Sequence, residues 1–136
     1  MKAVYFLLVL LGICKINAYA DTAPATNSER VITQVTSKNF SQIISSKKPV
    51  VIDVYADWCG PCKMFAPTFD EVQKEESQYD FAKLNGDEEE SLRDQLKVEA
   101  YPTVIFFKDG KEVGRYEGLL SKEKFQEKLK NYLNKQ

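Results

Sequence analysis

Residues 50–63 read Val-Val-Ile-Asp-Val-Tyr-Ala-Asp-Trp-Cys-Gly-Pro-Cys-Lys, and this stretch carries the most distinctive pattern in the chain. The apolar, β-branched run at its start predicts a strand that is buried on both faces, as strands are in parallel and mixed sheets. The stretch then reaches Cys59 and Cys62, which are separated by Gly60 and Pro61. The sequence therefore predicts a buried strand that leads to a dithiol.

Length and composition predict one globular domain. The chain has 136 residues, of which 43% are hydrophobic and 29% are charged, a balance typical of folded domains rather than of disordered or fibrous chains. Its 19 basic and 20 acidic side chains nearly cancel, and the formal net charge is −1. A protein this close to neutral has no large field for holding nucleic acid or an anionic membrane, so neither is expected as a partner.

The first 20 residues differ from the rest and predict a secretory signal peptide. Lys2 precedes an apolar run of 12 residues, 3–14, and the segment closes on Ala18 and Ala20, the A-x-A pattern that signal peptidase cleaves. A helical membrane span needs about 20 residues, so a permanent anchor is the weaker interpretation. A lipid-modified Cys14 is disfavoured because a bulky isoleucine precedes it. We expect an exported protein, periplasmic or secreted, that contacts a membrane only if the signal stays uncleaved.

With the signal removed, Cys59 and Cys62 are the only cysteines left. A disulfide between two cysteines this close in sequence closes only a short loop, so it contributes little to the stability of a domain. Exported proteins usually use cysteines for their own disulfides, so a lone CxxC pair points to chemistry on the disulfides of other proteins. Residues 21–29 lack periodicity and are expected to form a flexible leader into a domain that spans 30–136.

The remaining patterns predict alternating strands and helices. Short apolar runs predict strands over 31–35, 50–54, 81–84, 103–107 and 111–116, and Asp109-Gly110 is typical of a hairpin turn between the last two. Apolar residues at helical spacing predict a helix after each of the first three strands and one at the C-terminus. The order β-α-β-α-β-α-β-β-α predicts an α/β fold with a central mixed sheet and helices on both sides.

Polar and acidic residues predict where three of these helices begin. Thr36 or Ser37 is expected to cap the first helix, and Ser121 the last. The acidic run 87–90 is expected in the first turn of the third helix, where carboxylates meet the positive end of the helix dipole. This run is interpreted as a solvated helix start rather than a metal site.

The position of the dithiol predicts different tasks for its two sulfurs. Cys59 falls at a strand-to-helix turn, where unpaired backbone N–H groups and the helix dipole stabilise a thiolate, so it is expected to attack. Cys62 lies inside the first helical turn on the same side and is expected to be the less exposed, resolving sulfur.

Zinc binding and haem attachment, two other uses of a CxxC pair, do not fit the sequence. A zinc site needs four ligands, but the chain has no histidine and no third cysteine after processing. Covalent haem attachment needs a histidine directly after Cys62, where the chain has Lys63. No metal or other cofactor is therefore expected. A structural disulfide without a catalytic role remains open.

The hexapeptide from Trp58 to Lys63 resembles the active site of the thioredoxin family, and the likeness extends from Val31 to the C-terminus. The resemblance implies a thioredoxin fold, a three-layer α/β/α arrangement with a central mixed sheet. It also implies a thiol–disulfide oxidoreductase that reduces protein disulfides through Cys59 and Cys62. A reductase or a membrane electron donor would recharge the dithiol, and the protein is expected to be a monomer.

The resemblance also implies roles for two charged residues. Asp53 interrupts the apolar strand six residues before Cys59 and corresponds to the aspartate that exchanges a proton with Cys62 in this family. Lys83 corresponds to a strand lysine that tunes that aspartate. Two ordinary alternatives stay open at this point: Asp53 at an edge or bulge facing water, and Lys83 as a solvated surface lysine.

The substrate groove is also inferred from the resemblance. The residues it implies flank the dithiol, with the Tyr101–Pro102 bond in the cis form: Trp58, Gly60, Pro61, Tyr101, Pro102 and Gly118. The family usually has an aliphatic residue before this proline, so Tyr101 departs from its pattern. Most X-Pro bonds are trans, so the cis form rests on the resemblance alone.

Two alternative functions follow from the same residues. An exported disulfide oxidase or isomerase is disfavoured by Gly60-Pro61, because oxidases of this fold usually hold a histidine near the first cysteine. A non-catalytic binding subunit of thioredoxin fold would keep its role after Cys59→Ser or Cys62→Ser, and an intact Cys-Gly-Pro-Cys argues against it.

Overall fold

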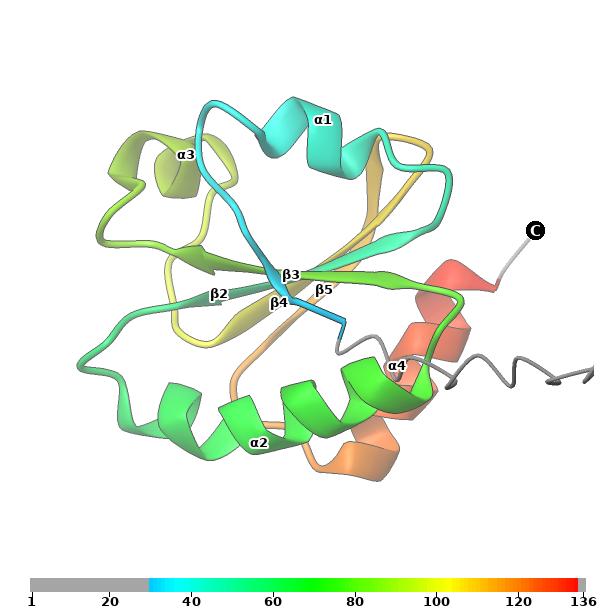
Figure 1. Cartoon of the computed structure of the whole chain (residues 1–136). Coiled ribbons are helices and arrows are strands. Elements are labelled where there is room, and N and C mark those ends of the chain that lie inside the picture. The colour runs from blue at the N-terminus through cyan, green and yellow to red at the C-terminus, as the bar shows by residue number, and fades with distance from the viewer. Residues whose placement is uncertain (1–29, 135–136) are drawn as a thin grey trace, which may run out of the picture.

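The computed structural model describes residues 30–134, so the predicted signal peptide 1–20 and leader 21–29 lie outside the described residues. A five-stranded sheet forms the middle layer, in the order β1-β3-β2-β4-β5 (Figure 1). Its strands are β1 Thr33–Gln34, β2 Val50–Tyr55, β3 Asp80–Asn85, β4 Thr103–Lys108 and β5 Lys111–Glu117. β1, β2 and β3 run parallel, and β4 and β5 complete the sheet antiparallel to their neighbours.

Helices cover both faces of the sheet, which confirms the predicted three-layer α/β/α architecture (Figure 1). The short helices α1 (Phe40–Ile44) and α3 (Glu90–Gln95) lie on one face, and the longer α2 (Gly60–Glu75) and α4 (Lys122–Leu133) lie on the other. The sheet's side chains divide between two apolar clusters. Val51, Val104 and Phe106 pack with α2 and α4, whereas Val50, Ile52 and Ile105 pack on the side of α1 and α3.

This alternation fixes where Asp53 points. Val51 faces α2 and α4, and successive strand residues point to opposite faces, so Asp53 faces the same side two residues later. β2 is the central strand, with β3 on one side and β4 on the other. The Asp53 carboxylate is therefore held inside the protein, over α2, which carries the dithiol at its N-terminus.

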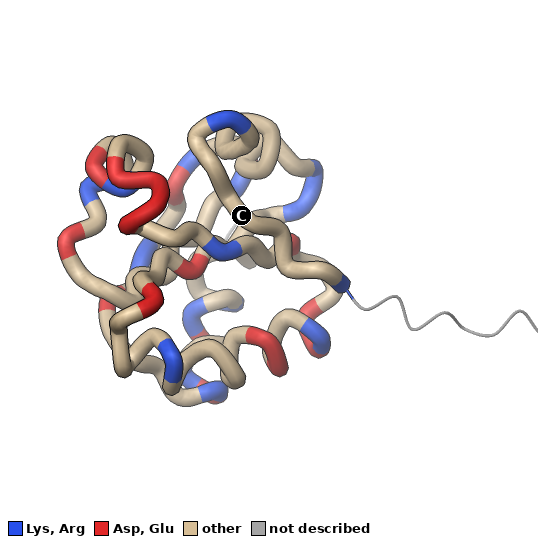
Figure 2. Tube along the Cα trace, turned by 60° about the vertical axis from the view of Figure 1, so that its left-hand side comes forward, with Lys and Arg blue, Asp and Glu red and all other residues tan. Residues whose placement is uncertain are grey.

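The C-terminal hairpin and helix confirm two predictions. Asp109 and Gly110 join β4 to β5 with φ values of 53° and 76°, the positive angles that a tight two-residue hairpin requires. Ser121 caps α4 and accepts a hydrogen bond from the backbone N–H of Lys124. Basic and acidic residues both occur along the whole described trace, and the acidic run 87–90 lies at the start of α3 (Figure 2).

The structure corrects three predicted boundaries. β1 has only two residues rather than five, and α1 is capped by Asn39 rather than by Thr36 or Ser37. The Asn39 side chain instead accepts the N–H of Thr36 and donates to the carbonyl of Gln34, and these bonds turn the chain out of β1.

The third correction concerns the acidic run, of which only Glu90 lies in the first turn of α3. Asn85 accepts the backbone N–H groups of Asp87 and Glu88. This turn delays the helix, because those N–H groups are already bonded to a side chain. Within residues 30–134, no helix is long and apolar enough to cross a membrane.

Candidate active site

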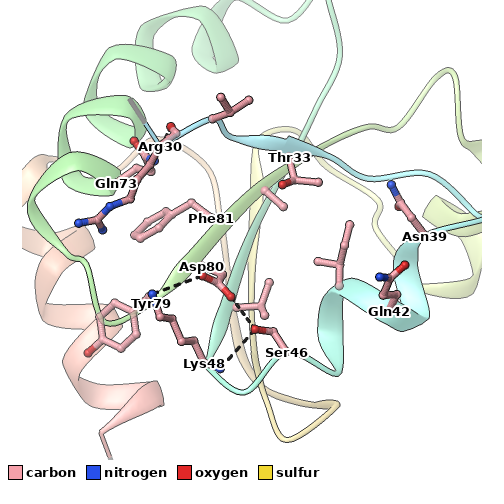
Figure 3. Close-up of a pocket in the computed structure, with 14 residues that line it drawn as sticks. Arg30, Thr33, Asn39, Gln42, Ser46, Lys48, Gln73, Tyr79, Asp80 and Phe81 are labelled. Atoms are coloured by element: carbon pink, nitrogen blue, oxygen red, sulfur yellow. Dashed lines mark hydrogen bonds and ion pairs between the residues drawn. The ribbon is translucent and has the colours of Figure 1, made fainter. Parts of the chain in front are cut away.

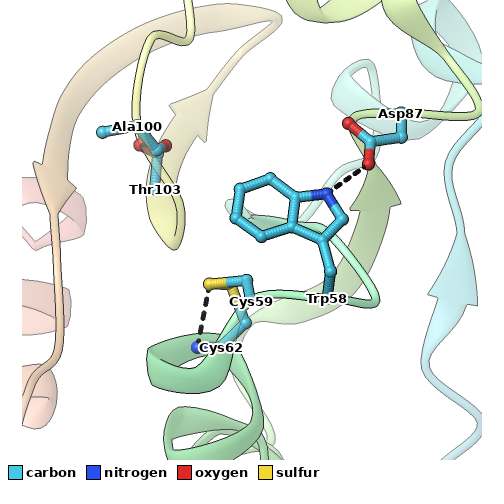
Figure 4. The surroundings of a disulfide bond; sticks show 6 residues. All are labelled: Trp58, Cys59, Cys62, Asp87, Ala100 and Thr103. Atoms are coloured by element: carbon cyan, nitrogen blue, oxygen red, sulfur yellow. Dashed lines mark hydrogen bonds between the residues drawn. A yellow bond between two sulfur atoms is a disulfide. The ribbon is translucent and has the colours of Figure 1, made fainter.

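A disulfide between Cys59 and Cys62 occupies the N-terminus of α2, with 5.3 Å between the two Cα atoms (Figure 4). Cys59 is the N-cap residue, in an extended conformation, and its Sγ accepts a hydrogen bond of 3.2 Å from the backbone N–H of Cys62. Proline is suited to the first turn because its missing N–H needs no partner there, and Pro61 takes that position. Local sequence therefore places one sulfur at the positive end of a 16-residue helix.

Both cysteines are almost fully buried in this oxidised form, Cys59 with 4% and Cys62 with 5% of its surface exposed. The difference in exposure expected between them is therefore absent from the disulfide. The asymmetry lies in hydrogen bonding, since the Cys59 sulfur is the one that receives the helix N–H. A thiolate at Cys59 would be stabilised by the same bond.

Asp53 lies beneath the dithiol as a buried carboxyl group with 2% of its surface exposed. Burial on the central strand rules out the alternative of an edge or bulge facing water. Desolvation raises the pKa of Asp53 from 3.8 to about 7, and the nearby Lys83 charge offsets only part of this rise. Its Oδ1 has no hydrogen-bond partner among residues 30–134. The group can therefore hold or release a proton near neutral pH.

Lys83 is the neighbour of Asp53 across the parallel pair of β2 and β3, in direct register. Its side chain is only 20% exposed, which rules out an ordinary solvated lysine. The ammonium forms its ion pair with Asp70 of α2, at 2.9 Å, and lies 5.5 Å from the centroid of the Phe69 ring. Asp53 and Asp70 therefore share one cation, and Asp70 has the closer contact.

Asp53 and Cys62 line the same cavity, which has a volume of about 240 Å³. Asp53, Cys62 and Lys83 all line it, together with Tyr55, Ala56, Asp57, Lys63 and Ala66. A cavity of this size can hold several water molecules, and its charged lining offers them hydrogen bonds. Water molecules in this cavity would be able to pass a proton between Asp53 and Cys62.

Trp58 stands beside the disulfide with 72% of its surface exposed. Its indole Nε1 donates a hydrogen bond of 2.7 Å to Oδ2 of Asp87 (Figure 4). Tyr101 packs edge-on against it, with ring centroids 6.0 Å apart, and also against the cluster that contains both cysteines. The indole is thus held from two sides while its face stays open to solvent.

Tyr101 reaches back over Gly86, where an added Cβ would lie 2.1 Å from the Tyr101 hydroxyl oxygen. No side chain other than hydrogen leaves room for this phenol. The Tyr101–Pro102 peptide bond is cis, as the resemblance implies. The Pro102 carbonyl accepts the N–H of Gly118 at 2.8 Å, and Gly118 has φ +97°, a conformation that favours glycine.

The structure therefore brings the sequence-predicted site residues to one end of the sheet. Asp53, Cys62 and Lys83 line one cavity beside α2, Tyr101 packs against both cysteines, and Trp58 contacts Tyr101. Sequence reasoning missed three neighbours, Asp70, Gly86 and Asp87. Asp70 carried a usable signal, because it follows Cys62 by two steps of four residues and so shares its helix face. The acidic run that includes Asp87 gave no sign of a bond to Trp58.

A larger cavity of about 710 Å³ lies at the opposite end of the sheet (Figure 3). Residues from the first ends of β2 and β3 line it, including Val50, Asp80 and Phe81, whereas the disulfide follows the far end of β2. Ser46 and Lys48 contact the Asp80 carboxylate at its rim. Size alone does not make this cavity the active site, because it contains none of the reactive groups.

Comparisons with known proteins agree with this geometry. The family model described as thioredoxin matches residues 31–131. A thioredoxin of Mycoplasmoides gallisepticum is 38% identical over 97 residues, covering 71% of this chain and 97% of its own. Thioredoxin-1 of Saccharomyces cerevisiae is 43% identical over 83 residues, covering 61% of this chain and 81% of its own. The crystal structure of Malassezia sympodialis thioredoxin aligns with a TM-score of 0.69 and 30% identity, covering 75% of this chain and 90% of its own.

Proposed function

The chain belongs to the thioredoxin family and is a protein thiol–disulfide oxidoreductase, and on that basis we propose that it works as a disulfide reductase, with Cys59 attacking and Cys62 resolving. The observation that carries the proposal is the position of the Cys59 sulfur as the cap of α2, bonded by the N–H of Cys62. A sulfur in that position is stabilised as the anion, and the thiolate is the form that attacks disulfides.

The reaction transfers two electrons to the substrate. The Cys59 thiolate attacks one sulfur of the substrate disulfide, forms a mixed disulfide and releases the other sulfur as a thiolate. Cys62 then loses its proton and attacks Cys59, which releases the second substrate thiolate and closes the disulfide seen here. A separate reductase must return two electrons to the enzyme before the next cycle, as it does for other members of the family.

Asp53 takes the role of proton acceptor for Cys62. Its carboxyl group is buried, has a pKa of about 7 and lines the same cavity as Cys62. A base with a pKa near the working pH is well suited to proton transfer. Lys83 contributes by favouring the ionised form of Asp53. The expected consequence is that Asp53→Asn slows the attack by Cys62 more than the attack by Cys59.

The substrate groove runs across the disulfide between Trp58 and the turn at Pro102. The exposed indole face offers an apolar contact, and the backbone around the cis bond offers polar groups to an extended peptide. Gly118, with its N–H bonded to Pro102, lies at the edge of this turn. Gly60 and Pro61, which lie between the two cysteines in the sequence, complete the proposed groove.

A turnover assay tests the nucleophile. Wild-type protein with dithiothreitol should reduce the disulfides of insulin, and Cys59→Ser should abolish turnover because no thiolate remains at the helix N-terminus. After reduction and removal of the reductant, Cys62→Ser should instead accumulate a mixed disulfide with the substrate, visible as a mass increase that fresh reductant reverses. Turnover retained by Cys59→Ser would contradict the proposal.

The direction of the reaction is tested by the reduction potential of the Cys59–Cys62 pair. Equilibration in dithiothreitol or glutathione buffers measures it, and for this two-electron couple each 30 mV corresponds to about 1.4 kcal/mol. If the protein is a reductase, the reduction potential of this pair should be as negative as that of thioredoxin. A potential close to that of the strong oxidants would instead assign the protein to disulfide formation.

We also propose that residues 1–20 direct the protein to a periplasm or secretory space and are removed by signal peptidase. The support is the sequence pattern that ends at Ala20. Mass spectrometry of the exported protein should find Asp21 at the new N-terminus. A chain that keeps residues 1–20 in the membrane fraction would show an anchored enzyme instead.

A further inference from the structure

We propose that Asp70 controls the proton on Asp53 by holding the Lys83 ammonium away from it, an inference that rests on the proton-transfer role proposed above for Asp53. Asp70 would touch neither sulfur nor substrate. It would be a positioning residue that acts through Lys83.

The contacts show a competition for one cation. Asp53 and Lys83 are direct neighbours in the β2–β3 register and point to the face covered by α2. Even so, the Lys83 Nζ lies 2.9 Å from Asp70 Oδ1, and the Asp53 Oδ1 has no partner within the described range 30–134. The Phe69 ring, with its centroid 5.5 Å from Nζ, supports the ammonium on the Asp70 side.

Asp53 and Asp70 differ in how strongly pairing with the Lys83 ammonium would favour their ionised forms. Asp53 is buried, so an adjacent positive charge would strongly favour its ionised form. Asp70 is about half exposed, so its carboxylate pairs with Lys83 without the cost of burying a charge, a cost that an ionised Asp53 would carry. Holding Lys83 on Asp70 therefore keeps Asp53 protonated at a pH where a closer ammonium would ionise it.

Other titratable groups around Asp53 give no comparable pairing. Those that line its cavity come from β3, from α2 and from the end of β2 and the loop that follows it: Lys83, Cys62, Lys63, Tyr55 and Asp57. On the other side of β2, the register partner of Asp53 on β4 is Val104, which carries no charge. Lys83 is thus the cation that the strand register brings directly beside Asp53, and Asp70 holds it.

An NMR titration of the Asp53 carboxyl carbon in the oxidised protein tests the inference, because neither cysteine titrates in that form. Asp70→Asn should move the midpoint down by about one pH unit, since Lys83 can then turn to Asp53 and a negative charge is lost. Glu71→Gln is the matched control: it removes the neighbouring carboxylate on α2, which pairs with Lys122 at 2.7 Å, and should leave the midpoint in place.

A second variant separates holding from simple repulsion. Lys83→Met should raise the Asp53 midpoint, and in that background Asp70→Asn should shift it by less than half as much as in the wild type. An equal shift in both backgrounds would show that Asp70 acts only as a nearby negative charge, and no shift in either would remove Asp70 from any role. Both results overturn the inference.

Kinetics distinguish this inference from the proposed function. The pH profile of the Cys62 attack, measured by the decay of a preformed mixed disulfide, should move to lower pH in Asp70→Asn together with the NMR midpoint. If the NMR midpoint moves and the kinetic profile does not, the hold of Asp70 on Lys83 stands and the proposed role of Asp53 fails.

Discussion

The indole Nε1 of Trp58 donates a 2.7 Å hydrogen bond to the Asp87 carboxylate, although 29 residues separate the two in sequence. The bond joins the loop before the dithiol to the turn after β3 and orients the most exposed aromatic face at the active site. Because the chain contains one tryptophan, fluorescence excited selectively at tryptophan reports on this residue alone.

Asp87→Ala should therefore loosen the indole without unfolding the protein. An exposed bond to a charged acceptor contributes about 1 kcal/mol, so we expect KM for a protein disulfide to rise by about fivefold or less with kcat nearly unchanged. Fluorescence anisotropy of Trp58 should fall at the same time. Glu88→Ala, which removes the next carboxylate along the chain, is the control. Equal effects of the two variants would mean that local charge, not the bond to Trp58, is responsible.

Gly86→Ala should destabilise the protein by about 1–3 kcal/mol, because the new methyl group would overlap the Tyr101 ring. Tyr101→Ile removes the ring, so Gly86→Ala should become nearly neutral in that background. Urea unfolding of the four proteins gives the coupling energy. Gly114→Ala, which would overlap Tyr132 instead, is the control and should cost the same with or without Tyr101. A Gly86→Ala effect that does not depend on Tyr101 would contradict this pairing.

Asp53→Asn should stabilise the oxidised protein by an amount that depends on pH. Burial raises the pKa of Asp53 from 3.8 to about 7, so between these values the unfolded chain loses the proton while the folded protein keeps it. The folded state is therefore penalised increasingly as the pH rises from about 4 to about 7, and the penalty is constant above that. At about 1.4 kcal/mol per unit it reaches at most about 4 kcal/mol.

Urea unfolding of the wild type and Asp53→Asn at pH 4, 7 and 9 measures this difference. The stability of the variant relative to wild type should grow between the first two values and then level off. A difference that stays the same at all three would show that Asp53 does not ionise with the raised pKa.

Gly118→Ala should destabilise the protein by about 1–2 kcal/mol, because residues with a side chain rarely adopt the positive φ found there. Gly60→Ala is a close control, since a Cβ at either position would meet open space, but Gly60 lies in the first turn of a helix. We expect Gly60→Ala to be neutral or slightly stabilising. Thermal unfolding compares the two, and similar losses would argue against backbone conformation as the cause.

Local sequence patterns were enough to predict the order of strands and helices, the hairpin at Asp109-Gly110 and the dithiol at a helix start. These features depend on local spacing, capping and turn chemistry, which neighbouring residues decide. The buried strand also marked Asp53 as an exception, because a carboxylate inside an apolar run has to be explained by something outside the run.

The partners that these residues contact depend on the three-dimensional packing of the chain. The strand register placed Lys83 beside Asp53, helix packing brought Asp70 to the same cation, and two turns joined Trp58 to Asp87. The same packing set Tyr101 over Gly86. Such contacts link residues far apart along the chain, and their geometry follows from how the layers pack together, which local patterns in the sequence do not encode.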